Sequence, residues 1–126
     1  MARILVTGGT GYIGSHTVVE LMQQGYEVLI VDNLSNSSID VLDGIAEIVG
    51  RKPEYANIDC GHYVDLDNIF NTHPDITGVI HFAASKAVGE SVEKPLLYYR
   101  NNIGGLVTLI EVMNAHQVHN LVFSSS

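Results

Sequence analysis

The stretch RILVTGGTGYIGSH, residues 3–16, decides how this chain folds. A short apolar run, Ile4 to Val6, leads directly into Gly8, Gly11 and Gly14, which follow one another at intervals of three residues. Glycines at this spacing let a buried strand turn sharply into a helix, and they let a pyrophosphate approach the backbone more closely than a Cβ atom would allow. The first helical turn then presents backbone N–H groups and the positive end of its dipole to an anion. The stretch predicts a phosphate-binding loop.

This glycine motif requires a strand before it, a helix after it and an acidic residue about 20 residues further on. After the glycines, apolar residues at helical spacing predict a helix that closes with Gly25 in the C′ position. Glu27 to Val31 then predicts a second strand, and Asp32 follows it. A carboxylate there can accept hydrogen bonds from both ribose hydroxyls of an adenosine and would repel a 2′-phosphate, which favours NAD over NADP. A glycine-rich turn with an unrelated surface aspartate is the alternative, and the intact strand–helix–strand context argues against it. The apolar residues of the helix are Ile13, Val18, Leu21 and Met22.

Composition limits the classes of protein to which the chain can belong. Its 126 residues are 46% hydrophobic with a mean hydropathy of +0.19, which is typical of one folded domain with a real core. The 14 acidic residues against 6 basic ones, a net charge of −8, argue against a nucleic-acid-binding surface. Cys60 is the single cysteine, so no disulfide framework and no cysteine-based metal site is expected.

Metal binding and membrane insertion are also not expected. The six histidines show no pair at i, i+4 and no cluster with acids at ligand spacing. The sequence passes from Met1 directly into a strand, and no apolar run approaches the ~18 residues of a membrane-spanning helix. We therefore expect a cytoplasmic protein.

Strand and helix patterns alternate along the rest of the chain. Continuous apolar runs without period-two alternation are typical of strands buried on both faces, and the intervening helices imply a parallel sheet with right-handed crossovers. We predict an α/β, doubly wound, Rossmann-like domain over residues 1–126, with five strands in the order 3-2-1-4-5. The later predicted elements are helix 39–50, strand 54–58, helix 64–70, strand 77–83, helix 95–116 and strand 120–124.

The motif Thr-Gly-x-x-Gly-x-x-Gly, here Thr7 to Gly14, resembles the fingerprint of the extended short-chain dehydrogenase/reductase family. Within that family the chain is most similar to the 4-epimerases that interconvert UDP-glucose and UDP-galactose. The resemblance extends over the whole chain. Its further blocks are Asp32–Asn36, His81–Ala83, Lys86–Ser91, Pro95 with Tyr98-Tyr99-x-Asn101-Asn102, and Phe123–Ser126.

The resemblance implies a tightly held NAD that takes hydride from C4 of a UDP-hexose and returns it to the opposite face of a 4-keto sugar. In that family a tyrosine, kept acidic by a lysine and the nicotinamide cation, is the base, and a serine hydroxyl assists it. It also implies a homodimer paired through helices of this domain. The helix 95–116 carries a broad apolar face for core or dimer contacts, formed by Leu97, Ile103, Leu106, Val107, Ile110 and Met113.

The resemblance assigns roles to individual positions. The catalytic serine would be Ser126, and Lys86 and Ser126 would contact the substrate. The cofactor contacts implied are Gly8, Gly11, Tyr12, Ile13 and Gly14 at the pyrophosphate, Asp32, Asn33, Leu34, Ser35, Asn36 and Ser37 at the adenosine ribose, Asp59 and Cys60 at the adenine, and Phe82, Ala83, Ala84, Ser85, Lys86 and Asn101 along the rest of the cofactor.

The chain departs from the family pattern at three places. Ala84-Ser85 replaces the usual Gly-Leu, and Asp59-Cys60-Gly61 replaces Asp-x-Arg, so a side-chain role for Cys60 is not expected from the match. None of the six tyrosines has a lysine four residues later, so the Tyr-x-x-x-Lys pair is absent. We therefore expect an inactive N-terminal part of a longer enzyme.

Two other functions fit the same residues. A different nucleotide-sugar enzyme of the family, a 4,6-dehydratase or a decarboxylase, would share the cofactor-binding half. A non-catalytic dinucleotide-binding module would need no Tyr-x-x-x-Lys pair. Two further residues have simpler structural interpretations: His81, inside an apolar strand, is expected to be a satisfied core imidazole, and Cys60 is expected to be inert.

Overall fold

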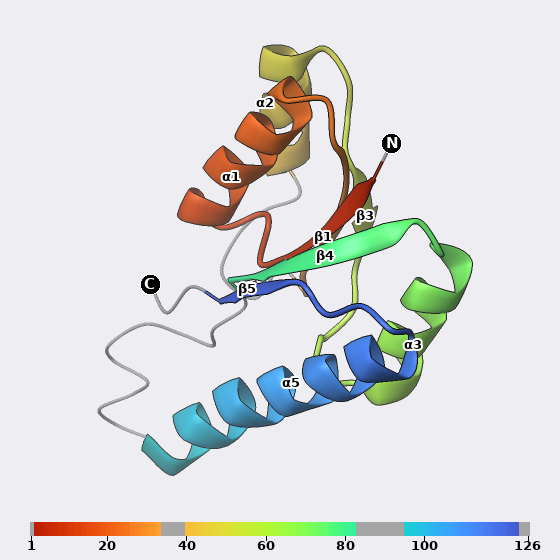
Figure 1. Cartoon of the computed structure of the whole chain (residues 1–126). Coiled ribbons are helices and arrows are strands. Elements are labelled where there is room, and N and C mark those ends of the chain that lie inside the picture. The colour runs from red at the N-terminus through yellow and green to blue at the C-terminus, as the bar shows by residue number, and fades with distance from the viewer. Residues whose placement is uncertain (1, 34–39, 83–94, 124–126) are drawn as a thin grey trace.

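Strands from distant parts of the chain assemble into a single parallel sheet with helices on both faces (Figure 1). The computed structural model describes residues 2–33, 40–82 and 95–123, with the backbone alone for residues 95–103. Within these ranges the sheet order is β3-β2-β1-β4-β5, which confirms the predicted order. The strands are β1 Arg3–Thr7, β2 Glu27–Val31, β3 Glu54–Ala56, β4 Ile76–His81 and β5 Leu121–Phe123, and the helices are α1 Tyr12–Gln23, α2 Asp40–Val49, α3 Tyr63–Thr72 and α5 Pro95–Ala115.

The sheet is apolar on both faces because helices cover both. Successive residues of a strand point to opposite faces, so Leu5 of β1 packs under α3 and α5 while Val6 packs under α1 and α2. Figure 1 shows these two helix pairs on opposite sides of the sheet. The side of α3 and α5 buries Leu5, Leu29, Val31, Cys60, Leu66, Phe70, Ile76, Val79, Leu109, Val112, Met113 and Val118. The side of α1 and α2 buries Val6, Val18, Met22, Val28, Ile30, Leu42 and Ile45.

Strand β2 has its predicted bounds, whereas β3 is shorter than its prediction. The pairing of β3 with β2 ends at Ala56, where the Asp32 N–H donates to the Ala56 carbonyl at 3.2 Å. The Ile58 N–H donates to the same carbonyl at 3.1 Å, so the chain turns there and β3 ends two residues before the predicted end at Ile58. At the end of α1, Gly25 has a φ of 95°, consistent with the predicted C′ position.

The predicted apolar face of the long helix is partly wrong. The positions of α5 that face the sheet are Gly105, Leu109, Val112 and Met113, all of which are buried. Val107 and Ile110 lie on the outer side of the helix, 49% and 39% exposed. The prediction failed because α5 is apolar around most of its circumference, so periodicity alone does not select the buried side. The side chains of Leu97 and Ile103 lie outside the described residues.

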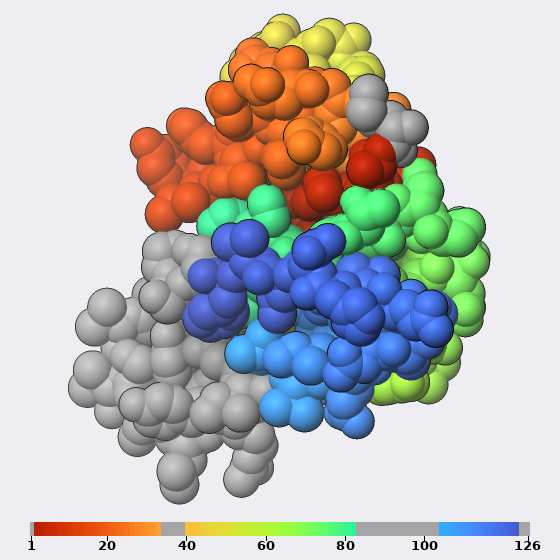
Figure 2. Space-filling model, viewed as in Figure 1, coloured from red at the N-terminus to blue at the C-terminus, as the bar shows by residue number. Residues whose placement is uncertain are grey.

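Strand β5 is an edge of the sheet in the described part of the chain, because it pairs with β4 alone. Its Val122 and Phe123 are 60% and 54% exposed. In the space-filling view the blue C-terminal residues accordingly lie at the surface beside α5 (Figure 2). Across residues 2–33, 40–82 and 95–123, none of the helices combines the length and apolar character needed to cross a membrane.

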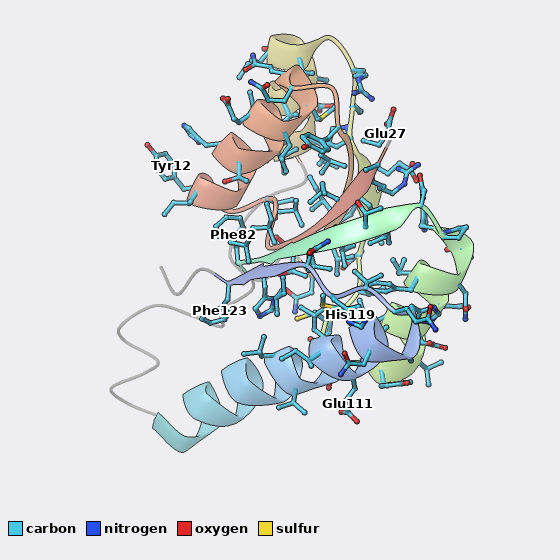
Figure 3. All side chains as sticks on the ribbon, viewed as in Figure 1. Tyr12, Glu27, Phe82, Glu111, His119 and Phe123 are labelled. Atoms are coloured by element: carbon cyan, nitrogen blue, oxygen red, sulfur yellow. The ribbon has the colours of Figure 1, made fainter. Side chains whose placement is uncertain are left out.

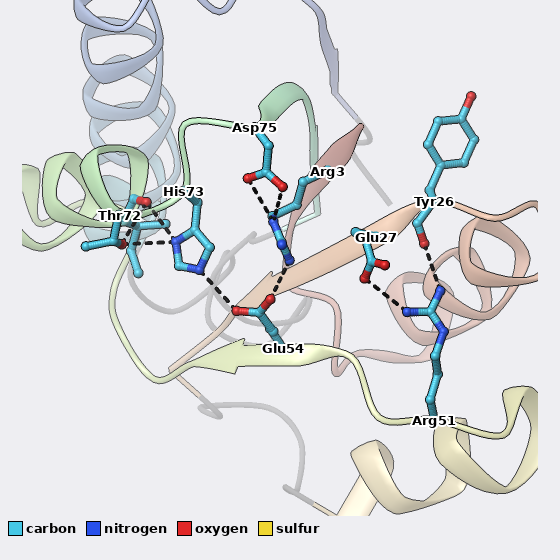
Figure 4. Close-up of polar contacts among 9 residues, drawn as sticks. Arg3, Tyr26, Glu27, Arg51, Glu54, Thr72, His73 and Asp75 are labelled. Carbon is cyan, nitrogen blue, oxygen red and sulfur yellow. Dashed lines mark hydrogen bonds and ion pairs between the residues drawn. The ribbon is translucent and has the colours of Figure 1, made fainter. Parts of the chain in front are cut away.

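A charged network joins the amino ends of three strands, at the edge of the sheet opposite the glycine loop (Figure 4). Arg3 Nε at the start of β1 donates to both carboxylate oxygens of Asp75 at 3.1 Å, and Arg3 also pairs with Glu54 at the start of β3. His73 Nε2 lies 3.1 Å from the other oxygen of Glu54. The Arg3 side chain is only 15% exposed, and its guanidinium lowers the pKa of the Asp75 carboxyl. Arg3 therefore connects the amino end of β1 to the amino end of β3, across β2, and to the start of β4.

Replacing Arg3 tests this role. Arg3→Met should lower the free energy of unfolding by about 1–2 kcal/mol, because the charge-assisted bonds of a half-buried arginine to two carboxylates are lost. Arg51→Met is the matched control, since Arg51 pairs with Glu27 but is 45% exposed, and its loss should cost at most about 0.5 kcal/mol. Urea unfolding of both variants measures the two values. Equal losses in the two variants would contradict this role of Arg3.

The ion pair between Arg3 and Asp75 also predicts a pH dependence. Because the pKa of Asp75 is lowered in the folded chain, the stability that the pair contributes is present at neutral pH and declines as the pH falls through that lowered pKa.

Candidate functional site

The glycine loop joins the carboxyl end of β1 to the start of α1. Gly8 has a φ of 71°, a left-handed conformation that residues with a Cβ rarely adopt. Its N–H donates to the Val31 carbonyl at 2.9 Å, and the Gly11 N–H returns to the Gly8 carbonyl at 3.1 Å. These two bonds tie the turn to the end of β2 and then fold it back toward the helix.

Helix α1 packs so closely on this turn that a side chain would not fit. A Cβ atom on Gly14 would lie 2.2 Å from the Gly8 carbonyl oxygen, far inside van der Waals contact. A Cβ on Gly9 would lie 2.8 Å from the side chain of Ile30. Gly14 and Gly9 therefore bring the helix and the loop directly onto the ends of β1 and β2.

The first turn of α1 offers backbone donors without a competing acid. Gly11 is the N-cap with no side-chain capping bond, and the first turn contains no acidic residue. The first intrahelical bond runs from the Ser15 N–H to the Gly11 carbonyl at 2.8 Å, so the N–H groups before Ser15 in this turn have no acceptor within the helix. This is the arrangement that binds phosphates at helix amino ends. Tyr12 points away from the sheet here (Figure 3) and is 81% exposed, and Ile13 is 46% exposed.

Asp32 lies next to the loop, at the end of β2. The Thr10 hydroxyl donates to Oδ2 of Asp32, and the Thr10 N–H donates to the same oxygen at 3.3 Å. The Asp32 backbone is held by the Ala56 carbonyl and by the Tyr55 hydroxyl, which donates to the Asp32 carbonyl at 2.9 Å. The structure thus brings the predicted phosphate loop and the predicted ribose acceptor into direct contact. Asn33, the next predicted residue, is exposed.

The sequence patterns did not single out Thr10. It occupies one of the variable positions of the glycine motif, and nothing in its spacing indicates a partner 22 residues away. The one feature of the sequence that could have identified Thr10 was its hydroxyl group within the glycine loop.

Of the two predicted adenine contacts after β3, one lies in an exposed turn and the other in the core. Asp59 Oδ1 accepts a hydrogen bond from the Gly61 N–H at 2.8 Å, which closes a tight turn. The Cys60 side chain instead points into the core under α3 and α5, close to Gly105. Burial raises the pKa of its thiol to about 11, which agrees with the expectation that Cys60 is inert. A backbone contact of Cys60 with an adenine stays a prediction.

Thr7 organises the ends of β1 and β4. Its hydroxyl oxygen lies 2.6 Å from Nδ1 of His81, and the Phe82 N–H donates to both the carbonyl and the hydroxyl of Thr7, at 2.9 and 3.1 Å. Burial lowers the pKa of His81, so this imidazole is neutral at physiological pH. The expectation that His81 is a satisfied core residue is confirmed. Phe82 packs at the end of β4 against the cluster on the α1 side (Figure 3).

Several predicted site residues lie outside the described part of the chain. They are Leu34, Ser35, Asn36, Ser37, Ala83, Ala84, Ser85, Lys86 and Ser126, together with the side chain of Asn101, whose backbone belongs to α5. Among the residues that the structure does describe, no three histidine, cysteine or acidic side chains are grouped as metal ligands would be.

Known proteins resemble this chain over nearly its whole length. The sequence model of the NAD dependent epimerase/dehydratase family matches residues 4–126. A UDP-glucose 4-epimerase of Dictyostelium discoideum is 54% identical over 98% of this chain and 36% of the relative, and one of Yersinia pestis is 54% identical with the same coverage. The chain therefore spans about a third of the length of these curated relatives.

Solved structures show the same similarity. A Stenotrophomonas maltophila UDP-glucose-4-epimerase with bound NAD and formylated UDP-arabinopyranose has a TM-score of 0.94 and 45% identity, covering 100% of this chain and 37% of that one. A Bifidobacterium longum UDP-glucose 4-epimerase in complex with NAD+ and UDP has a TM-score of 0.94 and 42% identity, covering 99% and 37%. The resemblance indicated by the sequence motifs is confirmed, as is the Rossmann-like fold.

A pair of helical glycines tests the steric argument. Gly14→Ala should destabilise the chain by more than about 2 kcal/mol, because the added methyl meets a backbone carbonyl that cannot move without opening the loop. Gly44→Ala in α2 is the control: a Cβ there meets no atom within 4 Å, so the change should stabilise the chain by about 0.5–1 kcal/mol. Chemical unfolding of both variants measures the sign of each change in the free energy of unfolding. A Gly14→Ala variant as stable as the unaltered chain would refute the close packing.

Proposed function

The chain belongs to the NAD dependent epimerase/dehydratase family, and from this membership we propose that residues 1–126 form the NAD-binding domain of a UDP-glucose 4-epimerase. The observation that carries the proposal is the contact between the glycine loop and Asp32, made through Thr10 at the carboxyl ends of β1 and β2. It combines an anion-binding helix terminus with a neighbouring carboxylate, as the pyrophosphate and ribose of one dinucleotide require.

The residues present fit NAD. A Cβ on Gly14 would lie 2.2 Å from the Gly8 carbonyl oxygen, so this glycine allows the close helix packing that a dinucleotide-binding turn requires. The N–H groups at the start of α1 would hold the phosphates, and Asp32 would accept the adenosine ribose hydroxyls. NAD would supply a hydride acceptor and donor for C4 of the sugar. In this proposal Phe82 shields one side of the cofactor from water.

The remaining assignments come from the family resemblance. Lys86 and Ser126 would contact the substrate, and the Ser126 hydroxyl would hydrogen-bond the C4 oxygen while a base removes its proton. None of the six tyrosines has a lysine four residues later, so the proposed base is not among these 126 residues. We further propose a UDP-hexose substrate, a cytoplasmic location and a homodimer. Similar epimerase structures hold UDP or UDP-glucose, and the exposed Val107 and Ile110 of α5 support subunit pairing.

Calorimetry tests cofactor choice. The purified chain should bind NAD at least about tenfold more tightly than NADP, because the Asp32 carboxylate repels a 2′-phosphate and loses its ribose hydrogen bonds. Asp32→Asn should narrow this preference, since the amide carries no charge. Asp43→Asn is the control, because Asp43 is an exposed carboxylate on α2 that pairs with Lys52, and it should leave both affinities unchanged. A preference for NADP would contradict the proposal.

A chimera tests the reaction. Residues 1–126 of this chain should replace the matching part of the Yersinia pestis epimerase, with which they share 54% identity, and retain conversion of UDP-galactose to UDP-glucose. The assay follows both sugars. A folded chimera that binds NAD and changes neither sugar would favour a non-catalytic module.

A further inference from the structure

Thr10 links the two halves of the candidate cofactor site. It lies between Gly9 and Gly11 in the glycine loop, and it is only 2% exposed. Both of its donors, the hydroxyl and the backbone N–H, are directed at a single oxygen, Oδ2 of Asp32. A buried threonine whose hydroxyl and amide converge on one carboxylate oxygen restricts the rotation of that carboxylate.

Different groups hold the backbone and the side chain of Asp32. Strand β3 holds the backbone, through the Ala56 carbonyl at 3.2 Å and the Tyr55 hydroxyl at 2.9 Å. On the opposite side, Thr10 of the loop donates to the carboxylate. The position of the Asp32 Cα therefore depends on the sheet, whereas the orientation of its carboxylate depends on the loop.

Orientation matters for the ligand that Asp32 is proposed to bind. Two adjacent ribose hydroxyls can both reach a carboxylate only when its plane is turned correctly toward the sugar. A carboxylate has about four acceptor positions, so bonds from Thr10 are compatible with further bonds from a ribose. A side chain that is ordered before the ligand arrives also loses less entropy on binding.

We propose that Thr10 is a positioning residue, which orients the Asp32 carboxylate toward the adenosine ribose and thereby sets both the affinity for NAD and the preference for NAD over NADP. This inference rests on the proposed function, since it assumes that Asp32 faces the ribose of a bound dinucleotide. Thr10 acts through Asp32 and touches no reacting atom.

Cofactor choice separates this role from a merely structural one. NAD and NADP carry the same pyrophosphate, so a variant that only loosens the glycine loop weakens both to the same extent. A variant that releases the Asp32 carboxylate weakens NAD, whose 2′-hydroxyl uses it, and leaves NADP nearly unchanged, because a 2′-phosphate has no hydroxyl at that position to donate to a carboxylate. The ratio of the two affinities is therefore the informative measurement.

The test is calorimetric titration of the purified chain with NAD and with NADP. Thr10→Val replaces the hydroxyl by a methyl group of similar size and should weaken NAD binding about tenfold while changing NADP binding less than about threefold. Thr10→Ser keeps the hydroxyl and should stay within about threefold of the unaltered chain for both nucleotides. Thr108→Val is the matched control, since the Thr108 hydroxyl bonds the Gly104 carbonyl at 3.0 Å on α5, and it should change neither affinity.

A double-mutant cycle completes the test. In an Asp32→Ala background, Thr10→Val should change NAD affinity less than about twofold, because the group it positions is absent. Equal weakening of NAD and NADP by Thr10→Val, or full additivity with Asp32→Ala, overturns the inference. If circular dichroism shows that Thr10→Val is unfolded, Thr10→Ala repeats the same measurements without placing a methyl group beside the carboxylate.

The inference and the proposed function fail in different ways. An unaltered chain that does not bind NAD, or whose NAD affinity is insensitive to Asp32→Ala, contradicts the proposed function and the inference with it. An unaltered chain that binds NAD through Asp32, while Thr10→Val retains full affinity and selectivity, contradicts the inference alone.

Discussion

The packing of α1 directly against the glycine loop is the constraint on which the rest of the site depends. The backbone of Gly14 approaches the Gly8 carbonyl so closely that a Cβ would lie 2.2 Å from its oxygen. This contact sets where the helix begins and aims its first N–H groups across the carboxyl ends of β1 and β2. The bond from the Gly8 N–H to Val31 then aligns the loop with the end of β2, where Asp32 stands. The steric requirement thus positions the first turn of α1, and the Gly8–Val31 bond places that turn beside Asp32.

The amino ends and the carboxyl ends of the strands carry different kinds of polar groups. At the amino ends of the strands, Arg3 is half-buried and bonded to the carboxylates of Asp75 and Glu54, so its charge is matched locally and holds these strand ends together. At the carboxyl edge, the helix amino terminus has no acidic partner in its first turn. A helix amino end without an acidic residue in its first turn favours an anionic ligand. The paired charges therefore lie at the amino ends of the strands, and the free backbone donors of α1 lie at the carboxyl ends.

Much of the candidate site could be predicted because its signals are local. The glycine spacing and Asp32 at the end of a strand follow from short stretches of sequence, and the motif blocks indicate the family on their own. Other features depend on side-chain direction, which a pattern does not contain. Cys60 turns into the core, and Val107 and Ile110 face outward from α5, because packing against the sheet selects one side of each element. The roles of Lys86 and Ser126, outside the described residues, stay predictions.

The sequence by itself determined the alternation of strands and helices and the position of the glycine loop, because hydrophobic periodicity and glycine spacing act over a few residues. The order of the five strands followed from the doubly wound topology that this alternation implies. The tertiary structure alone decided that Thr10 meets Asp32. These residues are 22 positions apart, and they come together because parallel pairing of β1 with β2 places the ends of both strands at the same edge. A contact between residues on two neighbouring strand ends depends on that register and on the direction of each side chain, neither of which the order of residues states directly.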